Sequence, residues 1–219
     1  MINNNNNKQT PYISNNNEIN NHYINIGSIN VRGLKNLVKQ QDFINDCLYH
    51  KLDIIGIQET HYTINSDKYN LKNNGHYLLY WAIDTTSSSS SYAGVGFLIK
   101  PYLAKHIHKC DSYKGRIIYL DLLFKGSKKL RIINVYVPPQ VNNHRKDIQR
   151  KTQELIQSTI EANYEVILLG DINTNIDKFN QRVINNQAIG SLQYDLLSQC
   201  NRFQLEDCAT KFDLQPPVT

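Results

Sequence analysis

The sequence lacks a long apolar run, a Cys-x-x-Cys pair and any histidine after position 144. Crossing a bilayer takes about 18 or more consecutive apolar residues, so we do not expect an integral membrane protein. The first residues also lack the basic and apolar blocks of a signal peptide, which argues against secretion. We therefore expect a nuclear or cytoplasmic protein that is neither secreted nor bound to a membrane.

The four cysteines, at positions 47, 110, 200 and 208, have the spacing of neither a zinc ribbon nor a thioredoxin-type redox pair. We expect four reduced thiols, most of them buried. This expectation fits a nuclear or cytosolic location.

Only 40% of the residues are apolar, and the shortfall is concentrated at the start of the chain. Residues 1–22 contain ten asparagines and almost nothing that could form a core. Burial cannot offset the ordering entropy of such a segment, so we expect 1–22 to be a disordered tail. The remainder, 23–219, has the length of one domain. Within it, the serine run 87–91 is expected to form a mobile loop.

Charge is distributed unevenly along the chain. Residues 100–151 carry thirteen Lys or Arg against three Asp or Glu, whereas 152–219 carry four against nine. A basic middle segment fits a polyanionic partner such as nucleic acid. A solvated surface would look the same, and on charge alone it is the more common explanation.

Apolar periodicity predicts a chain in which strands outnumber helices. Apolar residues recur every three or four positions in the predicted helices, which cover 34–50, 143–162 and 192–200. The predicted strands cover 23–31, 52–57, 77–83, 94–99, 116–124, 130–137 and 166–169. Residues 125–129, which include Gly126, predict a hairpin connection. This pattern favours antiparallel sheets with helices packed outside them.

Four short polar clusters stand where predicted strands end, a place where active sites are commonly built. They cover residues 28–34, 53–60, 133–138 and 166–173. Each has an ordinary explanation by itself: Asn30 could cap a helix, Glu59 could be an exposed carboxylate, and Asp171 could stabilise a turn. Their joint occurrence in this order is more informative than any one of them.

The motifs in these clusters give the sequence a resemblance to the endonuclease/exonuclease/phosphatase superfamily, whose fold is DNase I-like. They are Asn30-Val31-Arg32-Gly33-Leu34, Gln58-Glu59-Thr60, Asn134-Val135-Tyr136-x-Pro138 and Gly170-Asp171-x-Asn173. The sequence most resembles the apurinic-endonuclease-like nuclease domains of non-LTR (LINE-type) retrotransposons. Arg32 stands where the abasic-site repair enzymes of the family carry Asp, which favours the retrotransposon branch. The resemblance implies an α/β (α+β) four-layer sandwich, in which two mostly antiparallel sheets pack face to face with helices outside.

The resemblance also implies roles for five residues. Glu59 and Asn30 would hold one Mg²⁺ or Mn²⁺, a hard cation that needs few protein ligands besides water and phosphate. Asp171 would orient or deprotonate the attacking water, while Asn173 and Tyr136 would hydrogen-bond phosphate oxygens. The metal would polarise the scissile phosphodiester of DNA, whose phosphate backbone the basic segment could follow. No obligate protein partner is implied.

Two pieces of the family pattern are absent from the sequence: an Arg-x-Asp-Tyr-like strand and a terminal Ser-Asp-His motif, whose His contacts the scissile phosphate. We therefore expect a domain, 23–219, that is incomplete at its C-terminus, with its last strands missing and strand edges unpaired. Loss of a general acid or base costs about 10²- to 10⁴-fold in rate, so we expect weak or no activity.

Three functions stay open at this point. The first is a metal-dependent DNA endonuclease of retrotransposon origin. The second is a phosphatase or phosphodiesterase of the same superfamily that acts on an inositol phosphate or a lipid, since fold does not fix substrate. The third is a non-catalytic remnant that binds DNA. The motif at 30–34 and the basic segment favour the endonuclease.

Overall fold

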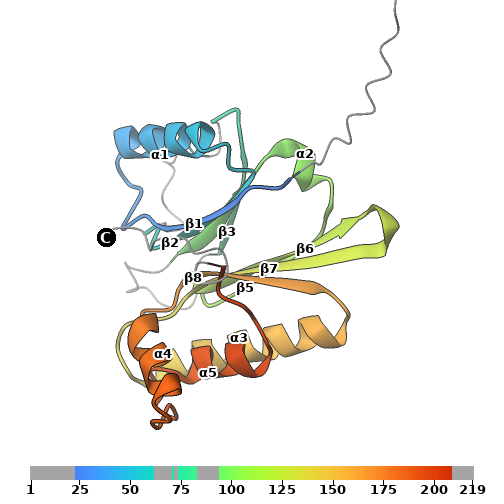
Figure 1. The fold of residues 1–219 in the computed structure, drawn as a ribbon. Helices are drawn as coiled ribbons and strands as arrows, with labels where there is room; N and C mark the ends of the chain where they lie inside the picture. The colour runs from blue at the N-terminus through green and yellow to red at the C-terminus, as the bar shows by residue number, and fades with distance from the viewer. Residues whose placement is uncertain (1–22, 62–70, 72–73, 83–93, 209–219) are drawn as a thin grey trace, which may run out of the picture.

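The computed structural model describes residues 23–61, 71, 74–82 and 94–208. These residues form two four-stranded sheets that pack face to face, with helices on both outer faces (Figure 1). The predicted layered α/β arrangement with helices outside is confirmed. The expected disordered tail, 1–22, and the expected serine loop, 87–91, lie outside the described residues.

The first sheet has the strand order β1-β2-β4-β3. Its strands are β1 (Ile26–Asn30), β2 (Ile54–Gln58), β3 (Leu78–Ala82) and β4 (Val95–Ile99). β1 runs parallel to β2, whereas β4 runs antiparallel to both β2 and β3.

The second sheet has the order β5-β6-β7-β8 and the same balance of directions. Its strands are β5 (Ile107–Tyr113), β6 (Ile117–Phe124), β7 (Lys128–Tyr136) and β8 (Glu165–Asp171). The β5–β6 and β6–β7 pairs are antiparallel, and β7 runs parallel to β8. The prediction of mostly antiparallel sheets is therefore confirmed, with one parallel pair in each sheet.

The main core lies between the sheets, where strands of both contribute fully buried apolar side chains. Ile54 and Phe97 come from the first sheet, and Leu120 and Ile132 come from the second. A second cluster fills the space under α1 (Leu37–Tyr49), and a third lies under α3 (Asn143–Glu161) and α5 (Asp195–Arg202). Burial on both faces explains why β2 and β4 read as continuous apolar runs rather than alternating ones.

The predicted helices are present, and each begins close to the predicted position. Asn36 caps α1 and Asn142 caps α3, each by accepting hydrogen bonds from the first turn. Among the described residues, two α-helices and one strand were not predicted: α2 (Pro101–Ala104), α4 (Ile176–Ile184) and β5; a 3₁₀ turn, η2 (Lys125–Ser127), lies in the predicted hairpin connection. The residues of β5 are mostly polar and exposed, so this strand carries no apolar alternation. No helix in the described ranges is both long enough and apolar enough to cross a membrane.

β8 lies at an edge of its sheet, and none of the described strands pairs with its outer side. Beside it runs a largely apolar groove of about 820 Å³. Ile167 of β8, Phe179 and Val183 of α4, and Leu197 of α5 are among its lining residues. Within the described ranges, the second sheet is thus covered on its α3 side and has no strand beyond β8.

The expectation that most cysteines are buried is wrong. Cys47, on the inner face of α1, is buried, but Cys200 is only partly buried, and Cys110 and Cys208 are exposed. Cys110 lies on β5, an edge strand with a solvent-facing surface, and Cys208 follows α5 where the described residues end. All four are free thiols, as expected.

Candidate active site

The site residues predicted from the sequence come together where the two parallel strand pairs end. Asn30 is the last residue of β1 and pairs in register with Gln58, the last residue of β2. Glu59 comes directly after Gln58. In the other sheet, Tyr136 ends β7 and pairs with Asp171, the last residue of β8. β1 and β8 both run from right to left in Figure 1 and end at the same side of the sandwich. Four strand ends therefore meet at one edge, the usual place for a site in such sheets.

A hydrogen bond joins the two sheets at this site. Asn30 Nδ2 donates to Asp171 Oδ2 at 2.9 Å, while Arg32 N donates to Asn30 Oδ1 at 3.0 Å. Asn173 N donates to the other carboxylate oxygen, Asp171 Oδ1, at 2.9 Å. Each oxygen of Asp171 thus accepts one hydrogen bond and keeps a lone pair for a further donor such as water.

The turn after β8 depends on two unusual backbone conformations. Gly170 has a φ of 132°, and a Cβ there would lie 1.9 Å from the carbonyl oxygen of Val135. Only glycine allows this approach, which sets Asp171 against the end of β7. Asn173 has a φ of 46°, in the left-handed region that asparagine tolerates. Its Nδ2 donates to Val137 O at 2.9 Å, so the turn is held against the residue that follows β7.

Glu59 also has a left-handed backbone, with a φ of 52°, and such strained residues cluster at functional sites. Its carbonyl oxygen accepts from Gly33 N at 2.7 Å, which fixes the loop after β1 to the loop after β2. Its side chain is 19% exposed. Burial, together with a hydrogen bond to Glu59, raises the pKa of Tyr136 to about 12. The shift shows that the Tyr136 hydroxyl is held as a neutral phenol against the Glu59 carboxylate.

His61 is a residue of this site that sequence reasoning missed. His61 Nε2 lies 3.9 Å from Glu59 Oε2. Burial lowers the pKa of His61, the negative charge of Glu59 raises it, and the positive charges of Lys35 and Lys39 lower it. The two lysines are therefore close enough to act electrostatically on the site. The available signal was the position of His61, directly after the Gln-Glu-Thr motif.

A buried amide cluster connects the two sheets next to the site. Asn134 Oδ1 accepts from Gln58 Nε2 at 2.6 Å, and Asn134 Nδ2 donates to Ile57 O at 3.1 Å and Gly96 O at 2.8 Å. Gln58 Nε2 also donates to Ser28 Oγ at 3.1 Å. The cluster links β7 with β1, β2 and β4. Satisfied buried amides fix the relative position of elements, and here they fix the strands that carry Glu59 and Tyr136.

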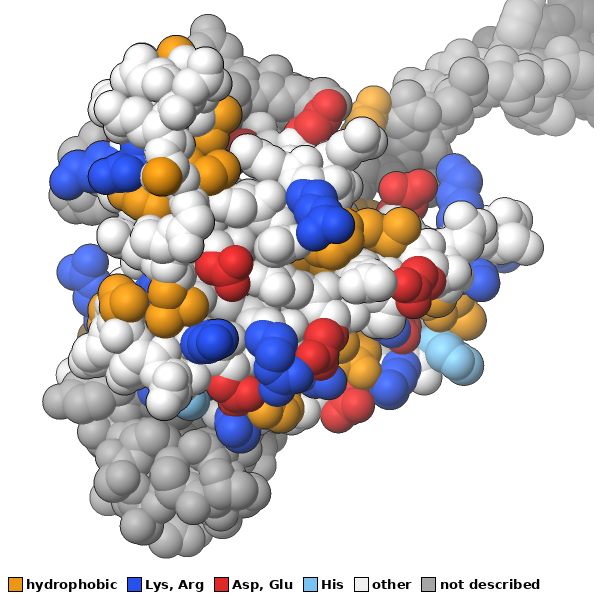
Figure 2. Space-filling view, turned by 90° about the horizontal axis from the view of Figure 1, so that it is seen from below, with side chains coloured by type: hydrophobic (Ala, Val, Ile, Leu, Met, Phe, Trp, Pro, Cys, Tyr) orange, Lys and Arg blue, Asp and Glu red, His pale blue; other side chains and the backbone are white. Residues whose placement is uncertain are grey.

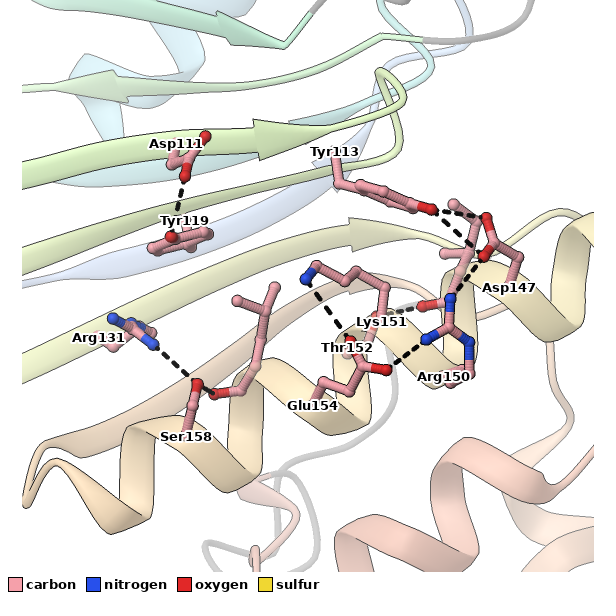
Figure 3. A network of polar contacts seen from close by, with 12 residues as sticks. Asp111, Tyr113, Tyr119, Arg131, Asp147, Arg150, Lys151, Thr152, Glu154 and Ser158 are labelled. Atoms are coloured by element: carbon pink, nitrogen blue, oxygen red, sulfur yellow. Dashed lines mark hydrogen bonds and ion pairs between the residues drawn. The ribbon is translucent and has the colours of Figure 1, made fainter.

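Part of the basic segment 100–151 is used inside the protein rather than on a DNA-facing surface. Three of its arginines are buried: Arg116, Arg131 and Arg145. On α3, Arg150 forms ion pairs with Asp147 and Glu154 (Figure 3). Figure 2, which views the molecule from below, shows Lys and Arg side chains intermixed with Asp and Glu. Lys35 and Lys39 add positive charge near His61 from outside this segment, whereas Arg116, over the ring of Tyr136, and Arg145, near Asp171, belong to it.

Two groups of the site suit a hard divalent cation. The Glu59 carboxylate supplies a charged oxygen, and Asn30 Oδ1 supplies a neutral oxygen. Asn30 Oδ1 accepts one hydrogen bond, from Arg32 N, and keeps a lone pair for a cation. Within the described ranges, no three His, Cys, Asp or Glu side chains gather in a way that could hold a metal ion by themselves. A cation here would therefore complete its shell with water and substrate phosphate, which is the habit of Mg²⁺ rather than of Zn²⁺.

Comparisons with known proteins agree with this geometry. A model of the endonuclease/exonuclease/phosphatase family matches residues 27–187. A search of curated proteins finds no match.

Three solved structures illustrate the likeness. AP endonuclease LMAP from Leishmania major has a TM-score of 0.64 at 15% identity, over 89% of this chain and 71% of that chain. The APE2 catalytic domain from Xenopus laevis has a TM-score of 0.56 at 17% identity, over 80% and 67%. An AP endonuclease from Archaeoglobus fulgidus has a TM-score of 0.54 at 16% identity, over 83% and 70%. At these identities the likeness shows the fold, and the predicted DNase I-like sandwich is confirmed.

Proposed function

Because the chain belongs to the endonuclease/exonuclease/phosphatase family, we propose that it is a metal-dependent phosphodiester hydrolase that cuts DNA. The observation that carries this proposal is the meeting of Asn30, Glu59, Tyr136 and Asp171 at one edge of the sandwich. Hydrolysis of a phosphodiester needs a positioned water, donors that stabilise developing negative charge, and an electrophile at the phosphate. The four residues offer groups for each need.

Asp171 is the group that would orient or deprotonate the attacking water. Hydrogen bonds from Asn30 Nδ2 and Asn173 N hold its two oxygens, so the carboxylate is fixed in one orientation. A general base works only within hydrogen-bond reach of the proton that it accepts. Asn30 therefore positions the base as well as lying beside the candidate metal ligand.

Tyr136 and Asn173 would donate to phosphate oxygens as negative charge develops on them. The Tyr136 hydroxyl has one hydrogen, which bonds Glu59 and would turn to a phosphate oxygen when Glu59 binds the cation. Asn173 Nδ2 donates one of its two hydrogens to Val137 O and has a second available for a phosphate oxygen. Donors that are already oriented before the reaction stabilise the transition state without reorganisation.

Glu59 would hold a Mg²⁺ or Mn²⁺ ion, with Asn30 completing the protein ligands. When bound, such an ion supplies Lewis-acid polarisation of the scissile phosphodiester. The partly buried position of Glu59 reduces competition from bulk water for its carboxylate. Lys35, Lys39 and the exposed Arg32 surround the same loops with positive charge, which favours a polyanionic substrate.

DNA is the substrate we propose, through its phosphate backbone. Two of the similar solved structures are named as AP endonucleases, which supports a nucleic-acid substrate. The motif Asn30-Val31-Arg32-Gly33-Leu34 supports an origin in the retrotransposon branch of the family.

The 219 residues by themselves should be a slow nuclease. They contain no Asp-His dipeptide, so the phosphate-contacting histidine of the family motif has no counterpart in the sequence. Loss of such a group costs about 10²- to 10⁴-fold. Single-turnover cleavage as fast as that of a relative with the full motif would contradict this expectation.

The test is nicking of supercoiled plasmid in Mg²⁺ by the wild-type chain, Glu59→Gln and Asp171→Asn. Both substitutions should lower nicking by at least about 10²-fold while leaving the unfolding midpoint nearly unchanged. Asp53→Asn is the matched control, because Asp53 precedes the opposite end of β2 and binds Asn25 N at 2.8 Å. This variant should nick as the wild type does.

The outcomes separate the candidate functions. Nicking that survives EDTA, or that survives both site substitutions, would overturn the proposal. Release of inorganic phosphate from an inositol phosphate without nicking would assign the chain to the phosphatases. Retention of DNA in Ca²⁺ without nicking in Mg²⁺ would identify a non-catalytic binding protein.

A further inference from the structure

Arg145, in the first turn of α3, is a fully buried charged side chain. Among the described residues no carboxylate forms an ion pair with it, and its Nε has no acceptor. Burial lowers the pKa of the guanidinium, and the negative charge of Asp171 opposes this. Burying a cation is costly unless hydrogen bonds compensate, so the partners of Arg145 indicate why it is there.

The partners are five neutral acceptors from three separate segments. They are Pro138 O at 2.6 Å, Asn173 O at 3.4 Å, Ile172 O at 3.2 Å, Thr174 Oγ1 at 2.7 Å and Gln193 O at 3.1 Å. The first segment follows β7, the second follows Asp171 at the end of β8, and the third precedes α5. One guanidinium therefore ties together the chain on both sides of the candidate base.

We propose that Arg145 is a positioning residue of the active site: it clamps the turn that carries Asp171 and Asn173 against the end of β7. This inference rests on the proposed function. The turn includes the left-handed Asn173, and its amide contacts with Asp171 Oδ1 and Val137 O require the present geometry. The planar guanidinium has two terminal nitrogens whose N–H groups donate to acceptors in different directions. A lysine has a single nitrogen and cannot reach all of these acceptors.

Arg131 provides an internal comparison for this assignment. It is also buried and also connects the second sheet to α3, where its Nη1 donates to Thr159 Oγ1 at 3.1 Å in the last turn. Its Nε and Nη2 bind both oxygens of Asp121, so it is an ordinary buried ion pair. Figure 3 shows it next to Ser158, near the opposite end of the helix from Arg145. If Arg145 served only to dock α3, substitutions of Arg145 and of Arg131 should have the same effects.

The experiment compares Arg145→Lys and Arg145→Met with Arg131→Lys and Arg131→Met, at a temperature where each variant is folded. One measurement is amide exchange at Asn173 and Val137, whose N–H groups bind Asp171. The other is plasmid nicking, separated into kcat and KM. In Arg145→Lys we expect exchange at both amides to accelerate about tenfold. We also expect kcat to fall about 10- to 100-fold with KM within about twofold, because the base is misplaced while binding is kept.

The Arg131 variants should lower the unfolding midpoint but leave the exchange at both amides and kcat unchanged. If Arg145→Met does not fold, Thr174→Val, which removes one acceptor of the clamp, should show the same changes as Arg145→Lys to a smaller degree. Arg145→Lys that lowers the midpoint as Arg131→Lys does, without a change in exchange or kcat, would overturn the proposal. If the wild type does not nick DNA, the proposed function fails, and the exchange measurement still decides whether Arg145 holds the turn.

Discussion

The parallel and antiparallel strand pairs of this protein contribute different things. The parallel pairs, β1–β2 and β7–β8, bring Asn30, Gln58, Tyr136 and Asp171 to one edge of the molecule. In the antiparallel pairs, the end of one strand lies beside the start of the next, as where Arg116, before β6, lies 4.8 Å from the ring of Tyr136 at the end of β7. The β5–β6 and β3–β4 pairs supply core and surface but none of the candidate site residues. The candidate site therefore lies at the edge where both parallel pairs have their carboxyl ends.

This division predicts that core and site respond differently to substitution. Changes at buried core positions away from the strand ends should alter the free energy of unfolding without altering the rate of the folded molecule. Changes at the ends of the parallel strands should act on activity or on the local geometry of the site.

The largest effect should come from Leu120→Ala on β6. Leu120 is fully buried between the sheets, so its truncation should leave a cavity and lower the free energy of unfolding by about 2–5 kcal/mol. Urea unfolding measures this loss, and nicking per folded molecule should be unchanged. Leu123→Ala is the control, because Leu123 lies on the same strand with its side chain exposed; it should cost less than about 1 kcal/mol. Equal losses in the two variants would contradict the assignment of this strand to the core.

Gly170→Ala should follow, with a loss of about 3 kcal/mol. The new Cβ would meet the carbonyl of Val135 on β7, and the backbone at φ 132° is strained for alanine. Gly126→Ala is the matched control, since Gly126 also has a positive φ, 76°, but nothing lies within 4 Å of a Cβ there. The difference between the two variants in thermal or urea unfolding isolates the close approach of β8 to β7. A difference near zero would show that the approach is readily relaxed.

Asn134→Leu should cost about 2 kcal/mol by urea unfolding. The change leaves the Gln58 amide with Ser28 Oγ as its remaining acceptor, so one buried N–H loses its partner, and it removes a donor from the carbonyls of Ile57 and Gly96. The double variant Gln58→Leu/Asn134→Leu should recover part of the lost stability, because the Gln58 amide that lacks its Asn134 acceptor is then removed as well. Additive losses would mean that the two amides do not act together.

The smallest effect should be a pH dependence that involves Tyr136. Its pKa is raised from about 10 to about 12, so the folded state favours the neutral phenol. The unfolded chain loses the proton first, so this stability is complete below pH 10 and is lost as pH rises toward 12. Tyr136→Phe should reduce the decline in stability between pH 10 and 12 by about 1 kcal/mol in urea titrations. Tyr49→Phe, at a tyrosine that is 81% exposed, is the control; an equal reduction there would contradict the prediction.

Much of the fold was predictable because most strands carry their own apolar signal. The residues of β7 and the capped helix α3 are examples, since their apolar positions and Asn caps are local features. β5 was not predictable, because its polar residues are extended only through pairing with β6. α4 could have been found, because Ile176, Phe179 and Val183 have helical spacing.

The candidate site was predictable as a set of residues but not as a geometry. The order of the four motifs pointed to Glu59, Asp171 and their companions. The sequence could not show that Asn30 would bind Asp171, because that contact depends on how the sheets pack. Nor could it separate Arg145 from the exposed cations of the basic segment, because burial of a charge leaves no local signal. The prediction that the segment follows the DNA backbone remains a prediction, now without its three buried arginines.

The hydrogen bond between Asn30 and Asp171 joins residues 141 positions apart. Synthesis proceeds at roughly 5–20 residues per second, so Asp171 is made about 7–28 s after Asn30. Such a contact has high contact order, and closing so long a loop belongs to the slow part of folding. Nascent chains that still lack β8 have most of the core strands but no assembled site. Catalytic competence should therefore arise in the same step that completes the second sheet.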